Sequence, residues 1–199
     1  MATGKTVRRW PCIEITKTTS WGASAPPERL GDYATLVAWA EREGLLSGVE
    51  SRELKRAASA DPAGAERVRA EALRLRGVLY RVLSGLARGR TPRAVDLEAL
   101  SEAAARVLPQ RRLRREGSRI AWSWLRSADL ERPLWPVVAS AAELLVDGPV
   151  DRLKACDADD CGWLFLDESR NRSRRWCDMA ECGNRAKVRR YRARRRDAE

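Results

Sequence analysis

Four of the five cysteines fall into two pairs with the same internal spacing, Cys156-x4-Cys161 and Cys177-x4-Cys182, with fifteen residues between the pairs. Each pair can supply two thiolates from one tight loop, and four thiolates satisfy the tetrahedral coordination that Zn²⁺ prefers. The segment that carries them is only about 45 residues long, which is too short to build a hydrophobic core of its own. We therefore predict one structural zinc ion, bound by all four cysteines, that makes this segment fold.

Other chemistry fits these cysteines less well. Four thiolate ligands leave no coordination position open for water, so the predicted zinc is structural rather than catalytic. Four unligated thiols in a reducing cytosol would leave the segment without a source of stability. Asp157, Asp159 and Glu168 match part of a calcium-binding EF-hand loop, but Cys161 occupies a position that needs an oxygen ligand.

The residues around the cysteines suggest how this segment is built. We predict a strand at Trp163–Leu166, a turn at Asp167–Ser173 and a return strand at Arg174–Trp176. A basic helix is expected after Gly183-Asn184, so that the last cysteine pair lies at a helix start. A knuckle, a hairpin and a helix in this order form a treble-clef-like four-cysteine module.

The first 150 residues have apolar residues at intervals of three and four, which is typical of helices. Capping residues and prolines predict five helix starts, near Asp32, Ser47, Asp61, Thr91 and Glu131. Gly44 and Gly89 end two of these helices, and Gly148-Pro149 ends the last one.

Two segments depart from this pattern. Ile120, Trp122 and Trp124 alternate with small or polar residues, which predicts a strand that pairs with Arg111–Arg115 through a turn at Glu116–Ser118. The first 31 residues are irregular, and one strand is expected over Cys12–Thr18.

The expected fold is therefore mainly α with a small β-hairpin (α+β). We place a domain boundary near Gly148-Pro149, where the composition changes. Residues 1–149 form the helical domain and residues 150–199 form the zinc module with its basic helix.

Charge and composition limit the function. The chain has a net charge of +11, a pI of about 10.2 and no histidine. The absence of imidazole excludes Ser-His-Asp and Cys-His catalysis, and the sequence has no G-x-S-x-G, G-x-G-x-x-G or phosphate-binding loop. We therefore predict that the protein is not an enzyme and that its first partner is a polyanion such as nucleic acid.

The basic residues concentrate near the cysteines. Eight of the residues from Asn184 to Arg196 are basic and none is acidic, and Val188 and Tyr191 are expected to pack back on the module. A rigid zinc-bound core that presents a cationic helix suits the DNA major groove, whereas the plainer alternative is a solvated basic segment. The predicted DNA contacts are Arg170, Arg172, Arg174, Arg175, Asn184, Arg185, Lys187, Arg189, Arg190, Arg192, Arg194 and Arg195.

Eight tryptophans accompany a single phenylalanine. Core filling explains most of them, but a pocket for a flat aromatic ligand is the alternative for four in the helical part. These four are Trp39, Trp122, Trp124 and Trp135. Cys12, the unpaired thiol, is expected to be a buried small apolar residue.

Three segments around the cysteines, 156–167, 170–177 and 182–187, strongly resemble the CGNR zinc finger, a family named for the string found here at Cys182–Arg185. Tyr33–Ala40 and Leu134–Leu145 are similar to the ABATE domain, which usually precedes that finger. The resemblance implies a bacterial, stress-linked transcription regulator that contacts DNA through the zinc module and senses a small molecule through the ABATE part. One phrase departs from the family pattern, because Lys17 stands where the family has asparagine.

The sequence analysis thus predicts a DNA-binding regulator whose helical domain senses a small-molecule effector or forms a homodimer. No stretch is long and apolar enough to cross a membrane and no secretion signal is visible, so we expect a cytoplasmic protein. Two alternatives stay open. One is an adaptor whose basic zinc segment docks an acidic protein partner, and the other is a small-molecule enzyme in the helical domain.

Overall fold

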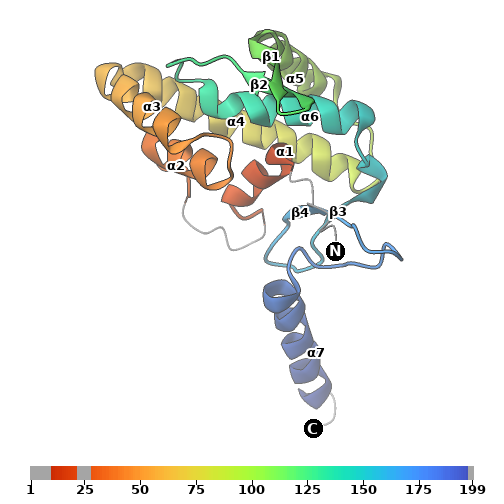
Figure 1. Ribbon diagram of the computed structural model, residues 1–199. Helices are drawn as coiled ribbons and strands as arrows, with labels where there is room; N and C mark the ends of the chain where they lie inside the picture. Colours follow the sequence, from red (N-terminus) through yellow and green to blue (C-terminus); the bar gives the residue numbers. More distant parts are fainter. Residues whose placement is uncertain (1–9, 22–27, 197–199) are drawn as a thin grey trace.

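The long helices begin at the capping residues that the sequence indicates. The computed structural model describes residues 10–21 and 28–196 (Figure 1). Asp32 and Ser47 each form a capping box, at the starts of α2 (Tyr33–Arg42) and α3 (Gly48–Ala60). Asp61 accepts a hydrogen bond from the Gly64 amide at the start of α4 (Pro62–Leu86). These three predicted helices are confirmed.

The remaining helices differ slightly from the expected bounds. α5 (Ala94–Val107) begins after Arg93, two residues beyond the predicted proline start. A 3-10 turn at Arg132–Leu134 precedes α6 (Trp135–Asp147). About 60% of the chain is helical, with two small antiparallel hairpins, so the predicted mainly α class is confirmed.

The strand expected over Cys12–Thr18 is wrong. This segment forms the short helix α1 (Pro11–Glu14) and a 3-10 turn, η1 (Ile15–Thr18). Pro11 at the first helical position favours the helix start. α1 packs on α6 and α4, and Cys12, Ile13 and Ile15 are all buried. A segment buried on all sides carries no alternation, so sequence periodicity cannot separate a strand from a helix there.

The hairpin predicted in the helical part is confirmed. β1 (Arg111–Glu116) pairs antiparallel with β2 (Arg119–Trp124), and Gly117 makes the turn with a φ of 61°. Only the base of the hairpin is half-buried, and Arg112–Ile120 is exposed throughout.

The strand predicted at Trp163–Leu166 pairs with a different segment from the one that the sequence indicates. β4 (Leu164–Leu166) pairs with β3 (Leu153–Ala155), which precedes the first cysteine pair, and residues 174–176 are not a strand. Leu153 and Leu164 are buried in the same core cluster as the helices. This burial favours β3 as the partner, because Arg174-Arg175-Trp176 offers no aliphatic side chain for that core.

The last cysteine pair leads into the basic helix, as expected. A single π-helical turn, η5 (Met179–Gly183), contains Cys182 and continues into α7 (Asn184–Arg196). Figure 1 shows α7 projecting away from the helical body, with β1 and β2 at the opposite end of the molecule. None of the helices in the described part of the chain has the length and apolar character needed to cross a bilayer.

Candidate metal centre and basic helix

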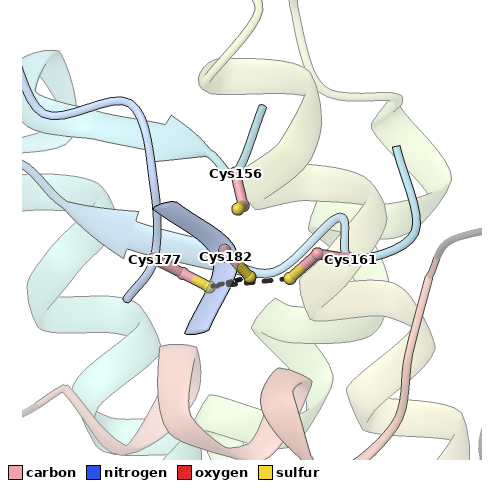
Figure 2. Close-up of side chains that lie close together, drawn as sticks. All are labelled: Cys156, Cys161, Cys177 and Cys182. Atoms are coloured by element: carbon pink, nitrogen blue, oxygen red, sulfur yellow. Dashed lines mark hydrogen bonds between the residues drawn. The ribbon is translucent and has the colours of Figure 1, made fainter. Parts of the chain in front are cut away.

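The four paired cysteines converge on one point (Figure 2). All four sulfur atoms lie within 4.8 Å of one another. The Cys177 sulfur lies 3.5 Å from that of Cys161 and 3.6 Å from that of Cys182. A tetrahedral zinc with Zn–S bonds of ~2.3 Å requires sulfur–sulfur edges of roughly 3.8 Å. The four cysteine side chains therefore have the spacing of a zinc site.

Backbone hydrogen bonds position the first cysteine pair. The Cys156 amide donates to the Trp163 carbonyl (2.8 Å), and the Cys161 amide donates to the Ala158 carbonyl (3.1 Å). Gly162 follows with a φ of 68°, and a Cβ atom there would lie 3.0 Å from the Trp21 side chain. Glycine is required at this position both by the backbone conformation and by the close approach of Trp21.

The thiols interact strongly enough to disturb one another's protonation. A hydrogen bond from Cys177 lowers the pKa of Cys161 to about 6. The same hydrogen bond raises the pKa of Cys177 far above its ordinary value. The cluster therefore resists carrying several negative charges by itself, and a divalent cation supplies the charge that four thiolates need.

Arg185, predicted as a DNA contact, lies against the metal centre. Its Nη2 donates to the Cys182 sulfur at 3.2 Å, and its Nη1 lies 3.3 Å from Asp160. Arg189, one helical turn further on, lies 3.6 Å from the same carboxylate. Asp160 thus ties α7 to the first cysteine pair, a role that the sequence analysis missed.

Three of the four arginines predicted between the cysteine pairs have partners inside the module. They are Arg172 with Asp151 (2.8 Å), Arg174 with the Trp176 carbonyl (2.8 Å) and Arg175 with Asp157 (2.7 Å). Arg170 is exposed. The guanidinium of Arg174 also stacks over the Phe165 ring at 4.7 Å.

A fully buried carboxylate holds the loop between β4 and Cys177. Asp167 accepts hydrogen bonds from the Lys154 ammonium (2.6 Å) and the Arg174 amide (2.9 Å). Burial alone would raise the pKa of Asp167, but these bonds and those from Ser169 outweigh it and hold the pKa well below its usual range. Asp167 lies in the predicted turn, but nothing in its spacing revealed that it is buried.

The outer part of α7 is exposed. Lys187, Arg189 and Arg195 are exposed, and Asn184 donates its side-chain amide to the Ala180 carbonyl (2.9 Å). The side chains of Arg190, Arg192 and Arg194 lie outside the described residues. The expected packing of Val188 and Tyr191 on the module is wrong, since their exposed fractions are 48% and 63%. Ala186 is buried instead, among the residues of this helix whose side chains the structure describes.

The four tryptophans proposed for a pocket do not meet at one place. Trp135 is buried in the core, and the half-buried Trp124 packs on it with 5.9 Å between ring centroids. Trp122 is 57% exposed on β2. Trp39 lines a separate cavity with Trp163. Burial raises the pKa of Cys12 to about 12, consistent with an unreactive core thiol.

That cavity lies between the helical body and the metal module. It measures about 490 Å³, and its walls include residues of α1, η1, α2 and the module. They include Glu14, Lys17, Thr18, Ala38, Trp39, Arg42 and Trp163. The Trp163 indole also donates to the Thr19 carbonyl at 2.8 Å. Trp163 directly precedes β4, so it connects the cavity wall to the strand between the two cysteine pairs.

Both parts of the chain match models of known protein families. Residues 152–195 match the family model of the CGNR zinc finger. Residues 10–148 match the ABATE model, described as "Putative stress-induced transcription regulator". No curated protein matches the chain.

Proposed function

The chain belongs to the ABATE family and carries a CGNR zinc finger, and from this premise we propose that it is a DNA-binding transcription regulator. The observation that carries the proposal is the position of α7. This cationic helix projects from the body and is held at its base by the Arg185 contacts with Cys182 and Asp160. Zinc binding therefore determines where the helix points.

The chemistry of α7 matches duplex DNA. An α-helix fits the major groove, where arginine and lysine bind guanine edges or phosphates. Lys187, Arg189 and Arg195 are exposed on it, and Lys187 and Arg195 have no partner within the described residues. Arg185, by contrast, contacts a metal ligand, so its contribution is to orient the helix as well as to attract DNA.

The small-molecule effector is proposed to bind in the cavity lined by Trp39 and Trp163. Apolar rings and a few charged groups are the usual lining of such sites. A ligand there would contact the helical body and, through Trp163, the strand between the metal ligands. Binding in the cavity would change the position of the zinc module only if the ligand has a higher affinity for one position of Trp163 than for another.

Selection of DNA from pooled genomic fragments tests the regulator proposal. Three proteins are compared at two salt concentrations. They are the zinc-loaded parent, an α7 variant with Lys187→Ala and Arg195→Ala, and a control variant with Lys55→Ala and Arg56→Ala at exposed positions of α3. We expect a common sequence to be enriched by the parent and control, and lost by the α7 variant. The salt slope of log K should fall by about 2 for that variant, at roughly 0.9 per phosphate contact. Uniform weak binding by all three proteins would overturn the proposal.

The cavity proposal has its own test. Ala38 is exposed at the cavity wall, so Ala38→Trp fills the space without removing a contact. Compounds that raise the Tm of the parent but not of Ala38→Trp are cavity ligands, and those ligands should alter DNA affinity. A compound library that stabilises both proteins equally would contradict the assignment.

The runner-up function is an adaptor that docks an acidic protein through the basic module. Salt weakens both kinds of binding, so discrimination between DNA sequences is what separates them. The family descriptions name a regulator and a zinc finger rather than an enzyme. Sedimentation velocity of the parent, with and without DNA, tests the proposed homodimer.

A further inference from the structure

The β1–β2 hairpin is held firmly at its base and uncovered at its tip. At the base, Arg111 forms an ion pair with Glu143 of α6 (2.7 Å), and the Leu125 amide donates to the Gln110 carbonyl (2.9 Å). Beyond the base, every residue from Arg112 to Ile120 is exposed. The hairpin therefore projects as a wing, and its tip contributes little to the packing of the body.

One face of this wing is apolar although it is uncovered. Cross-strand partners share a face of a hairpin, so Leu113 lies beside Trp122 and Arg115 beside Ile120. The exposed fractions of Leu113, Ile120 and Trp122 are 64%, 73% and 57%. A hairpin normally gains its stability by burying one face. An exposed apolar group on a rigid support is typical of an interaction surface.

The wing is also strongly cationic. Residues 111–119 contain five arginines and one acidic residue, Glu116. Arg111 is paired with Glu143, and the Arg112 guanidinium donates to two nearby carbonyls. Arg114, Arg115 and Arg119 have no ion-pair partner among the residues that the structure describes. Three unpaired cations therefore accompany three exposed apolar side chains.

Charge decides between the partners that could cover this surface. A second copy of the wing would bring like charges together, and the whole chain carries +11. Duplex DNA offers one negative charge per roughly 1.7 Å of its axis. Its major groove admits a two-stranded ribbon, and apolar side chains can insert between bases in the minor groove. The combination of arginine, leucine, isoleucine and tryptophan suits this partner.

We propose that the β1–β2 wing is a second duplex-DNA-binding element, separate from α7. The wing and α7 lie at opposite ends of the molecule (Figure 1), so they cannot contact the same few base pairs of a straight duplex. One chain would then hold two DNA segments together, or bend one segment around the body.

A bridging assay with the full zinc-loaded chain tests this inference. One random-sequence duplex is immobilised, the protein is added, and capture of a second, fluorescent duplex is measured. The wing variant carries Arg114→Ser, Arg115→Ser and Arg119→Ser, and its control carries Arg52→Ser, Lys55→Ser and Arg56→Ser on α3. All six residues are exposed, so we expect unchanged Tm values. The wing variant should still bind the first duplex but capture at least tenfold less of the second.

Combining the wing and α7 variants separates this inference from the proposed function. In a chain with Lys187→Ala and Arg195→Ala, adding the three wing substitutions should reduce the remaining salt-dependent binding further, whereas adding the three α3 substitutions should not. If the wing variant bridges as well as the control, the inference is wrong, whatever α7 does. If Ile120→Ser and Trp122→Ser instead dissociate a dimer in sedimentation velocity while bridging persists, the wing is an interface between copies and the inference is likewise overturned.

Discussion

The ring of Trp21 stacks on the ring of Tyr80, with 3.6 Å between centroids and 3° between planes. The same two residues hold the first cysteine pair. The Trp21 amide donates to the Cys161 carbonyl (3.2 Å), and the Tyr80 hydroxyl donates to the Gly162 carbonyl (3.2 Å). The metal module is therefore docked on the helical body through the backbone of one of its own ligands.

Gly162→Ala tests this docking. Both Gly162 and Gly44 have positive φ, but a Cβ at Gly44 would meet no atom within 4 Å. Left-handed backbone costs alanine about 1–2 kcal/mol at either site, and at Gly162 the contacts with Trp21 and Tyr80 add to this. We expect urea unfolding to show a larger loss of stability for Gly162→Ala, accompanied by faster zinc release to a chelating dye. Equal stability losses, with unchanged zinc release, would contradict the docking.

Zinc removal should loosen the module and leave the helical body folded. The sulfur cluster is held by few apolar contacts of its own, whereas the α4 core contains fully buried leucines such as Leu79 and Leu83. Hydrogen exchange after chelation should show protection lost over residues 156–183 and kept in α4. Re-addition of zinc should restore it. Loss of protection throughout the chain would mean that the body depends on the metal as well.

Asp160→Asn should release α7 from the module. Asp160 pairs with Arg185 and Arg189, whereas the neighbouring Asp159 is exposed and has no partner within the described residues. Asp159→Asn removes the same charge and serves as the control. We expect faster hydrogen exchange in α7 and weaker discrimination between DNA sequences for Asp160→Asn alone. If the two variants behave alike, the ion pairs do not position the helix.

The Glu28–Arg76 ion pair should add an acid-sensitive contribution to stability. Two hydrogen bonds from the buried Arg76 guanidinium hold the pKa of Glu28 below its usual value of 4.5. A lowered carboxyl pKa stabilises the folded state above pH 4.5, and this stabilisation is lost as the pH falls through the lowered value. The difference in unfolding free energy between parent and Glu28→Gln should therefore be largest near pH 7 and shrink below pH 4.5. Glu98→Gln, on the exposed side of α5, should show a much smaller change with pH.

Local signals explain what could be predicted from the sequence. The caps at Asp32, Ser47 and Asp61 and the alternation in β2 act within a few residues, so the sequence determined these elements directly. The cysteine spacing likewise predicted that these four residues cluster, because each short loop brings its own two thiols together. The boundary near Gly148-Pro149 and the DNA contacts stay predictions.

Contacts between distant segments were decided only by the tertiary structure. The helix at Pro11–Glu14 and the Trp21–Tyr80 contact with the cysteine loop depend on residues far apart in the chain. The pairing of β3 with β4 is local, but it is favoured by burial of Leu153 and Leu164 in the core that the helices form. Local periodicity carries no information about such partners, since burial by another element replaces the pattern that exposure to water would impose. For the same reason, the sequence does not reveal the contacts of Asp160, the burial of Asp167 or the exposure of the wing.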